Sequence, residues 1–376
     1  MTAADPGARL AVDPDVTRAA TLPKAFYLDA ALYELARERI FAHTWQWLGD
    51  DADVDEPGSL APRTLLPGLL DEPLLLVRDG AGVLRCLSNV CTHRGNILVD
   101  APCRGARQIR CGYHSRRFDL DGRLRAMPGF DGARDFPTPA DDLAQVPSAQ
   151  LGGLRFAALA PAAPFDEFFA PVQAQLAGRA ALDGLVADPS RSRDYEFDAH
   201  WALYVENYLE GLHIPFVHPG LAQTLALADY GYALHRYAAL QVGIAREGEA
   251  AFGDDASDTP GAGGPRIAAW YWWVFPNLML NFYPWGLSLN VVQPLGPART
   301  RVLFRSYVAD AARLGQGAGG ALDEVELQDE AVVQTVQRGI RSRFYSRGRY
   351  APAHERAVHH FHRLIGEFMG GSPAGN

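Results

Sequence analysis

Two closely spaced pairs of metal-binding side chains constrain the fold of this chain more than any other feature. Cys91 lies two residues before His93, and Cys111 lies three residues before His114. Each pair suits one tight loop, and two such loops facing each other could hold a metal centre between them. Two thiolates and two imidazoles could bind a single Zn²⁺ tetrahedrally. They could equally hold a [2Fe-2S] cluster, with both sulfurs on one iron and both nitrogens on the other.

The order of these ligands along the chain favours the cluster. Zinc fingers usually pair Cys with Cys and His with His, whereas here each loop supplies one of each type, as a Rieske cluster requires. Imidazole ligands raise the reduction potential, so such a centre would accept an electron readily from a flavin or ferredoxin donor. The other two cysteines, Cys86 and Cys103, have no histidine at a matching spacing. We predict that both are ordinary reduced thiols.

Length and charge narrow the class of protein. The chain has 376 residues, of which 48% are hydrophobic, and this is enough to build two domains. A formal net charge of -9 argues against nucleic acid or an anionic membrane as the main partner. No stretch approaches the roughly 18 apolar residues of a membrane helix. The first residues lack the basic head and apolar run of a secretory signal. These features together predict a cytoplasmic protein.

The pattern of apolar residues divides the chain into three parts and predicts an α+β fold. Residues 1–45 are expected to form an arm and a helix that packs on the last domain. Residues 46–155 contain short β-like runs separated by turns such as Asp79-Gly80, and all four cysteines, which predicts a small all-β domain. Residues 156–376 predict a central antiparallel sheet with helices against it. We expect helices near 29–41, 165–180, 201–212, 321–340 and 353–368, strands at 269–282, 287–294 and 300–309, and mobile loops at 247–265 and 315–320.

A second group of metal-binding residues follows Trp201. On a continuous helix Glu206, Glu210 and His213 would share one face. Pro215 disfavours helix at the preceding residue, so His213 is expected at the helix end and His218 on the turn beyond it. This break would let both imidazoles reach one metal. Taken alone, the two histidines could also be satisfied core residues.

The third ligand of a two-His, one-carboxylate iron site should be a distant acid. Asp329 precedes the apolar stripe Val332, Val333, Val336 and Ile340 of a predicted helix. An acid on an apolar helix face is costly unless it is paired or bound to metal. Glu326 shares this stripe and is the competing candidate, whereas Asp323, Glu324 and Glu330 are expected to be solvated.

These motifs resemble a known family. Asn89-Val-Cys-Thr-His-Arg-Gly95, Cys111-Gly-Tyr-His114 and Phe118-Asp-Leu-Asp-Gly-Arg-Leu124 resemble the Rieske domain of aromatic-ring-hydroxylating and related oxygenases. The run from Glu206 to Pro219 is similar to the mononuclear-iron motif of that family, and Gln328-Asp329 with Gln337-Arg-Gly339 resembles its choline-monooxygenase-like branch. One departure is visible, because the family usually has Gly-Trp where this chain has Ser115-Arg116.

The resemblance implies a complete catalytic arrangement. A Rieske [2Fe-2S] cluster would be held by Cys91, His93, Cys111 and His114, and Fe(II) by His213, His218 and Asp329, in a helix-grip domain that uses O2 as co-substrate. Glu210 would bridge to His114 of a neighbouring subunit in a head-to-tail homotrimer, and Asn207 also matches the catalytic motif. No GxGxxG or P-loop fingerprint is present. Electrons would therefore come from a separate NAD(P)H-dependent reductase.

The substrate is less constrained by the sequence. Aromatic residues are concentrated at Trp270-Tyr-Trp-Trp273 and near Trp285, which could form a cage for a quaternary ammonium group by cation–π attraction, although most should be core. The run Phe275–Asn281 is similar to choline monooxygenase. Hydroxylation or oxidative dealkylation of such a compound and dioxygenation of an aromatic or alicyclic substrate both remain open. Two further alternatives are a zinc-stabilised binding module and a catalytically silent scaffold.

Overall fold

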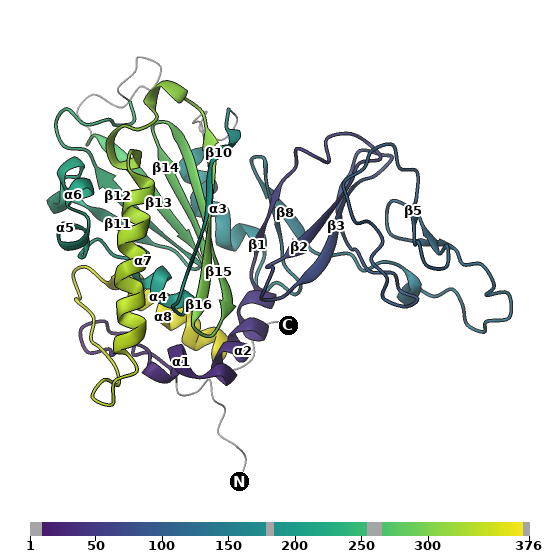
Figure 1. Cartoon of the computed structure of the whole chain (residues 1–376), viewed down its shortest axis with the longest axis horizontal. Helices are drawn as coiled ribbons and strands as arrows, with labels where there is room; N and C mark the ends of the chain where they lie inside the picture. The colour runs from purple at the N-terminus through teal and green to yellow at the C-terminus, as the bar shows by residue number, and fades with distance from the viewer. Residues whose placement is uncertain (1–9, 178–183, 254–264, 371–376) are drawn as a thin grey trace, which may run out of the picture. The chain divides into compact units, whose positions relative to one another are not determined.

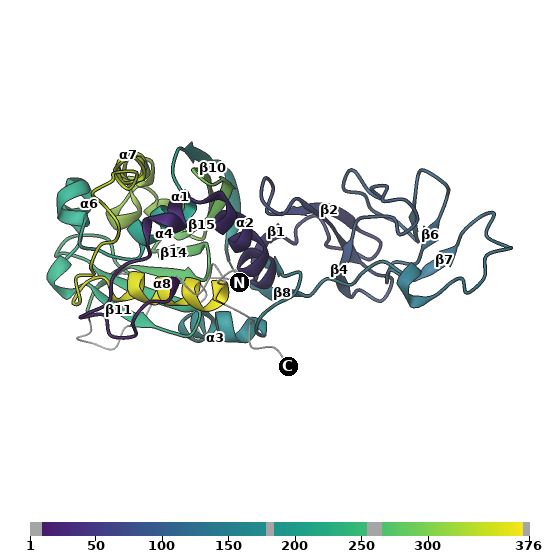
Figure 2. The same ribbon diagram turned by 90° about the horizontal axis from the view of Figure 1, so that it is seen from below.

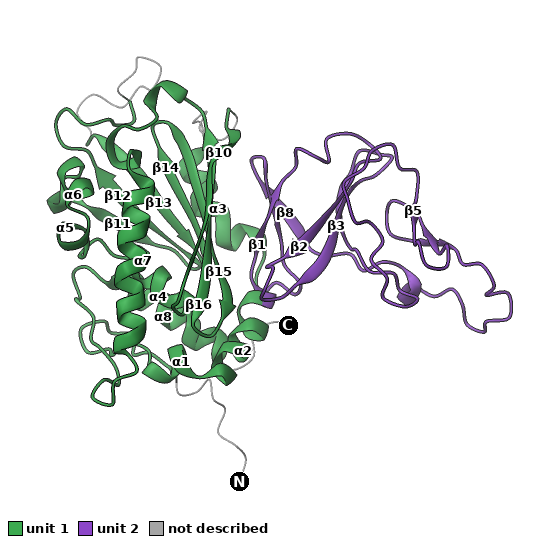
Figure 3. Ribbon diagram, in the orientation of Figure 1, with its two compact units in different colours: residues 1–41, 162–376 green, residues 42–161 purple. Residues whose placement is uncertain are grey.

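The structure is a computed structural model that describes residues 10–177, 184–253 and 265–370 (Figure 1). The chain divides into two compact units, one of residues 42–161 and the other of residues 1–41 with 162–376 (Figure 3). Along the described residues no helix is both long and apolar enough to cross a membrane.

The unit of residues 42–161 consists of three small antiparallel sheets. One pairs β1 (Gln46–Asp50), β9 (Leu154–Ala157) and β8 (Ser148–Leu151). The second pairs β2 (Leu60–Leu65), β3 (Glu72–Arg78) and β4 (Leu84–Ser88), and the third pairs β5 (Ile109–Arg110), β6 (Arg117–Phe118) and β7 (Leu124–Ala126). Asp79 holds the predicted turn between β3 and β4, because its carboxylate accepts hydrogen bonds from the backbone of Ala81 and Val83.

The two cysteine–histidine loops belong to this unit. The first loop follows β4, and the second connects β5 to β6. Cys91 and Cys111 are both buried in one apolar cluster with Ile109 and Phe118. The strands on either side therefore fix the positions at which the two loops begin.

The other unit is built on a seven-stranded antiparallel sheet. Its order is β10-β16-β15-β14-β13-β12-β11, so sequential strands are neighbours except that β10 pairs with the last strand. In Figure 2, α7 (Leu322–Gly339) and α3 (Phe165–Leu176) lie on opposite sides of this sheet. The strand bounds are β10 Val186–Phe197, β11 Gly231–Leu234, β12 Ala238–Ile244, β13 Ile267–Val274, β14 Leu278–Tyr283, β15 Gly286–Gly296 and β16 Arg299–Val308. The helices are α1 Lys24–Leu28, α2 Ala30–Arg39, α3 Phe165–Leu176, α4 Trp201–Tyr208, α5 Ile214–Val217, α6 Pro219–Thr224, α7 Leu322–Gly339 and α8 Arg356–Met369.

The register of the sheet places one row of polar side chains on the same face. Gln241 of β12 pairs with Tyr271 of β13, Tyr271 with Asn281 of β14, and Asn281 with Ser288 of β15. Directly paired residues point to the same side of a sheet. A polar row is therefore built into the middle of a core that is otherwise apolar.

The combination of a β unit with a large antiparallel sheet and helices confirms the predicted α+β class, but several expected elements differ. The apolar run 269–282 forms two strands joined by a turn rather than one. The polar strand β10 was not predicted. It is an edge strand with mostly exposed residues, so its sequence lacks the alternation of apolar and polar residues that marks a half-buried strand. The expected loop 315–320 is packed, since Ala318 is buried. Of the expected loop 247–265, residues 254–264 lie outside the described part.

The expected helix 201–212 ends early, at Tyr208. Gln241 donates a 2.7 Å hydrogen bond to the carbonyl oxygen of Tyr208. In a continuing helix this oxygen would accept a hydrogen bond from the backbone amide of the next turn. The carboxylate of Glu210 accepts hydrogen bonds from the backbone of Leu212 and His213. The chain then restarts as α5 and α6, with His218 between them. Hydrogen bonds made by the side chains of Gln241 and Glu210 thus replace the backbone hydrogen bonds of the helix at this point.

Candidate metal centres

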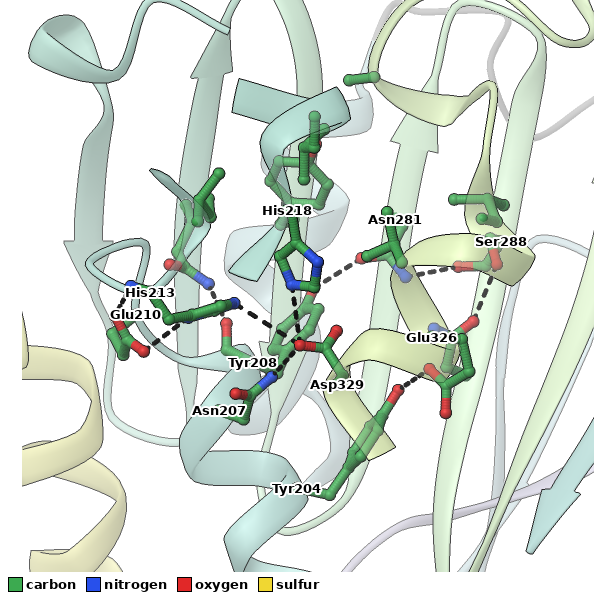
Figure 4. A pocket seen from close by; sticks show the side chains of 18 of the residues that line it. Tyr204, Asn207, Tyr208, Glu210, His213, His218, Asn281, Ser288, Glu326 and Asp329 are labelled. Atoms are coloured by element: carbon green, nitrogen blue, oxygen red, sulfur yellow. Dashed lines mark hydrogen bonds and ion pairs between the residues drawn. The ribbon is translucent and has the colours of Figure 1, made fainter. Parts of the chain in front are cut away.

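Three predicted iron ligands meet in the larger unit. His213, His218 and Asp329 each offer a ligand atom within 4.8 Å of the others. Nε2 of His218 lies 2.9 Å from Oδ1 of Asp329, and Nε2 of His213 lies 3.7 Å from the same oxygen. Two imidazoles and one carboxylate are the donor set of mononuclear non-haem iron sites. The donor set and its spacing therefore fit such an ion (Figure 4).

Both imidazoles are held by a hydrogen bond to their other ring nitrogen. Oε1 of Glu210 lies 2.6 Å from Nδ1 of His213, and Oε1 of Gln328 lies 2.7 Å from Nδ1 of His218. Such partners fix the tautomer and leave Nε2 free to bind a metal. Gln328 directly precedes Asp329, so one turn of α7 supplies both a ligand and the support of another ligand.

The carboxylate of Asp329 is also fixed from outside its own helix. Nδ2 of Asn207, on α4, donates a 2.6 Å hydrogen bond to Oδ1 of Asp329. Burial lowers the pKa of His218, but hydrogen bonding to Asp329 and the Asp329 charge raise it, and the net result is a pKa above the usual value. Without a metal, a proton on His218 is thus stabilised where a cation would otherwise lie.

Glu326, the competing candidate for third ligand, does not join this group. It is 2% exposed and accepts a 2.5 Å hydrogen bond from the hydroxyl of Tyr204. Burial raises the pKa of its carboxyl well above the usual value. Its Oε1 has no hydrogen-bond partner among the described residues. Glu326 is therefore a buried acid beside the candidate iron site.

The predicted apolar stripe of α7 is wrong in part. The buried residues of α7 are Glu326, Val333 and Gln337, whereas Val336 is 41% exposed. Glu330 was expected to be solvated, but burial raises the pKa of its carboxyl. The inward face of α7 is polar because it faces the site and the buried end of α4, where Gln337 accepts a hydrogen bond from the backbone of His200.

Glu206 was expected on the same face as Glu210 and His213, and this expectation is also wrong. Its Oε1 accepts a 2.8 Å hydrogen bond from the hydroxyl of Tyr27 and lies 3.1 Å from Nε2 of His362. The helix ends before Glu210, so the 100° spacing does not continue to His213. Glu206 instead joins α4 to α1 and α8.

A pocket adjoins the candidate iron site, between α4, α7 and the polar row of the sheet. Its aromatic lining is tyrosine and phenylalanine, not tryptophan. Trp272 and Trp285, expected to form a cage, are each 1% exposed and line no part of this pocket. They pack in the core, as large aromatic residues of a sheet usually do. The pocket is lined by Tyr204, Asn207, Tyr208, Glu210, His213, Ile214, His218, Leu221, Tyr230, Gln241, Tyr271, Asn281, Tyr283, Ser288, Asn290, Phe304, Ala318, Leu322, Val325, Glu326 and Asp329.

Sequence reasoning missed these pocket residues because they come from distant strands. The hydroxyl of Tyr208 donates a 2.8 Å hydrogen bond to Oδ1 of Asn281. The hydroxyl of Ser288 donates to Oδ1 of Asn290 at 2.8 Å. Only the pairing register brings these side chains together. The available signal was the presence of Asn281, Ser288 and Asn290 in runs that are otherwise apolar.

The four predicted cluster ligands meet in the other unit. The rings of His93 and His114 are 4.7 Å apart, and the thiol of Cys111 is hydrogen-bonded to that of Cys91. Nδ1 of His114 is buried and has no partner among the described residues. An orphaned buried nitrogen in this position suits a metal ligand.

The pairing of the four donors favours a cluster over zinc. Each loop supplies one thiol and one imidazole, and the two thiols contact each other, as do the two imidazole rings. This grouping of sulfur with sulfur and nitrogen with nitrogen fits a two-iron cluster with the sulfurs on one iron and the nitrogens on the other.

Comparisons with known proteins agree with this chemistry. A model of the Rieske [2Fe-2S] domain matches residues 44–137, and a model of the ring hydroxylating alpha subunit catalytic domain matches residues 187–371. Choline monooxygenase of Arabidopsis thaliana is 29% identical over 94% of this chain and 84% of its own length. The carnitine monooxygenase oxygenase subunit of Acinetobacter baumannii is 27% identical over 95% of this chain and 96% of its own.

The fold has solved counterparts. A solved structure of a quaternary ammonium Rieske monooxygenase matches 98% of this chain and 100% of that chain, with a TM-score of 0.74 and 24% sequence identity. At this identity the match shows the fold. The two family models, the two sets of metal-binding residues and the shared fold all point to one class of enzyme. The chain belongs to the Rieske non-haem iron oxygenases, as an oxygenase alpha subunit.

Proposed function

We propose that this oxygenase hydroxylates or oxidatively dealkylates a small quaternary ammonium compound, with electrons from a separate NAD(P)H-dependent reductase. The observation that carries the proposal is the pocket beside His213, His218 and Asp329. Its walls combine tyrosine rings with carboxylates, and none of its described lining residues is Lys or Arg. The names of the relatives, choline and carnitine monooxygenase, support the same substrate class.

The tyrosine rings suit a cationic headgroup. Tyr230 and Tyr271 lie 6.5 Å apart, and Tyr271 and Tyr283 lie 6.0 Å apart, measured between ring centroids. Burial raises the pKa of each of these phenols, so the rings stay neutral. A quaternary ammonium group has no N–H to donate, and the faces of desolvated aromatic rings attract it by cation–π interaction.

The charge balance of the pocket selects among such compounds. The carboxylates of Glu210 and Asp329 line the wall, and a substrate carboxylate would find no Lys or Arg to pair with. Burying an unpaired anion is costly. We therefore expect a choline-like cation to bind better than a zwitterion such as carnitine.

We assign metal binding to three residues of this site and the positioning of these ligands to three others. His213, His218 and Asp329 would hold the iron, which when bound supplies the activation of O2. Asn207 and Gln328 keep Asp329 and His218 in place through the hydrogen bonds already described. Glu210 keeps His213 in place, and we propose that in a homotrimer its carboxylate also reaches His114 of a neighbouring subunit and joins cluster to iron.

The experiment measures substrate-dependent O2 consumption by the iron-loaded protein with a chemical or enzymatic electron source. The probes are choline, its uncharged isostere 3,3-dimethylbutan-1-ol, carnitine, and naphthalene. Support requires O2 consumption matched by loss of choline, with a weaker response to the isostere and to carnitine. Equal responses to choline and the isostere would reject the cation pocket. Turnover of naphthalene alone would establish the alternative, a ring-hydroxylating dioxygenase.

A variant pair sharpens this test. Tyr271→Leu removes one ring face and should reduce choline binding at least tenfold more than isostere binding. Tyr232→Leu is a control, because Tyr232 is on β11, beyond β12 in the same sheet, and does not line the pocket. Equal losses in the two variants would contradict a role for the pocket tyrosines.

A further inference from the structure

Arg116 is an unusual buried cation beside the cluster loops. Its side chain is 2% exposed, although it directly follows the second loop, only two residues after His114. A fully buried arginine is rare unless it is paired. We propose that the buried charge of Arg116 raises the reduction potential of the [2Fe-2S] cluster, and thereby helps the cluster to take electrons from its donor.

The backbone ties Arg116 closely to a cluster ligand. The amide of Cys111 donates a 2.8 Å hydrogen bond to the carbonyl oxygen of Arg116, and the amide of Ser115 donates a 3.1 Å bond to the carbonyl oxygen of Cys111. Ser115 has a φ of 60°, which turns the chain sharply between the two. The loop of Cys111 and His114 is thus closed by Arg116.

Aromatic rings surround the guanidinium and connect it to the other loop. Its Cζ lies 5.7 Å from the centroid of Phe118 and 5.5 Å from that of Phe136. Phe136 contacts Phe130 at 4.7 Å, and Phe130 contacts the ring of His93 at 5.5 Å. These rings keep water away from the charge. A charge in a dry environment acts at a longer range than the same charge in water.

The counter-ion of Arg116 cancels this charge only in part. Nη2 of Arg116 lies 2.8 Å from Oδ1 of Asp141, but the side chain of Asp141 is 22% exposed against 2% for that of Arg116. The other carboxylate oxygen of Asp141 accepts hydrogen bonds from the backbone and hydroxyl of Thr138. Nε of Arg116 has no hydrogen-bond partner among the described residues. Water therefore screens the negative charge of Asp141 more strongly than the positive charge of Arg116.

The position of Arg116 lets its charge act on the cluster. Its backbone closes the loop that carries Cys111 and His114, and its guanidinium is buried. A buried cation next to the cluster favours an added electron, since reduction makes the cluster more negative.

A purely structural role for Arg116 must be separated from this electrostatic one. The carbonyl oxygen of Asp141 accepts a hydrogen bond from the hydroxyl of Thr92, in the first loop, and another from Nη2 of Arg116. Asp141 thus connects the two loops, and breaking the ion pair could move both. Neutralising either partner breaks the same contact, but the two changes alter the local charge in opposite directions.

The experiment is a redox titration of the full-length, cluster-loaded protein, followed by EPR or circular dichroism, on four variants. Arg116→Gln should lower the equilibrium constant for reduction at least tenfold, which corresponds to 59 mV for a one-electron couple. Asp141→Asn should shift the potential upward. Arg116→Lys should remain close to the original protein. Arg117→Gln is the matched control, because Arg117 is exposed and adjacent and its charge is screened by water.

Each outcome either supports or overturns the proposal that the charge of Arg116 raises the reduction potential. Downward shifts in both Arg116→Gln and Asp141→Asn would assign a structural clamp and overturn the proposal. An unchanged potential in Arg116→Gln, with the EPR signal of the cluster intact, would also overturn it, as would an equal shift in Arg117→Gln. If Arg116→Gln does not retain the cluster, an upward shift in Asp141→Asn supports the proposal, and its absence rejects it.

Discussion

The side-chain amide of Asn207 donates a 2.6 Å hydrogen bond to Oδ1 of Asp329, the same oxygen that lies 2.9 Å from Nε2 of His218. This bond joins α4 to α7 at the point where the candidate iron ligands meet. The carboxylate is therefore positioned before any metal binds, because its orientation is set by a residue on another helix.

The first prediction separates Asp329 from Glu326 as the third ligand. Asp329→Asn should abolish binding of the mononuclear iron and leave roughly two irons and two sulfides per chain in the cluster. Glu326→Gln should keep the full iron content, because Glu326 is bonded to Tyr204 and lies outside the ligand group. Iron and acid-labile sulfide analysis of anaerobically purified protein measures both. Loss of iron in Glu326→Gln alone would reverse the assignment.

The second prediction concerns the support of the carboxylate. Asn207→Ala should weaken Fe(II) binding about 10- to 100-fold, the usual cost of losing an outer hydrogen bond at a metal site. Asn290→Ala is the control, because Asn290 lines the same pocket but bonds to Ser288 rather than to a ligand. Anaerobic Fe(II) titration gives both affinities. Equal affinities in the two variants would show that Asn207 does not position Asp329.

The third prediction uses the raised pKa of Glu326. The folded state holds this proton more strongly than the unfolded state, so stability from Glu326 is present below the unfolded pKa and is lost as pH rises toward the folded pKa. Glu326→Gln cannot ionise and should melt at least about 2 °C above the original protein at pH 8. The difference should shrink near pH 5.

Thermal denaturation of iron-free protein across this pH range checks the third prediction. Glu324→Gln is the control, because Glu324 is exposed on the same helix and should show no such pH-dependent gain. A gain for Glu326→Gln that is equal at both pH values would mean that ionisation is not its cause.

The fourth prediction tests the packing of residues 317–319 against the pocket wall. A Cβ on Gly319 would lie 2.7 Å from the ring of Tyr283, which is too close for either group to stay in place. Gly319→Ala should therefore cost about 1–3 kcal/mol of stability, as overpacking usually does. Gly220→Ala should be close to neutral, because nothing lies within 4 Å of its added Cβ. Chemical denaturation compares the two, and a neutral Gly319→Ala would mean that this segment moves freely.

Much of the chemistry was predictable from short stretches of sequence. Cys91 with His93 and Cys111 with His114 are local pairs, so each pair can be recognised within one loop, whereas the strands bring the two loops together. The predicted [2Fe-2S] cofactor, the oxygenase class and the α+β fold are confirmed. The roles of the individual ligands remain predictions that the iron analyses test.

Other expectations failed because tertiary contacts override local patterns. The helix through Glu206 was expected to reach His213, but Gln241 takes the carbonyl oxygen of Tyr208 and the helix ends there. The cage was expected in the aromatic runs Trp270–Trp273 and near Trp285, but of these named residues only Tyr271 lines the pocket. Which aromatic residues face a cavity depends on strand register and on the helices above them, and neither is encoded within a single segment.

The sequence by itself pointed to the metal chemistry, since the type, spacing and order of the cysteines and histidines favour a [2Fe-2S] cluster. The tertiary structure decided the shape and polarity of the pocket. Gln241, Tyr271, Asn281 and Ser288 come from four strands and meet only through their pairing register. The burial of Arg116 was decided in the same way, by rings and a carboxylate from outside its own loop. Residues close together in the sequence indicate which cofactor binds, whereas long-range packing determines the polarity and charge around it.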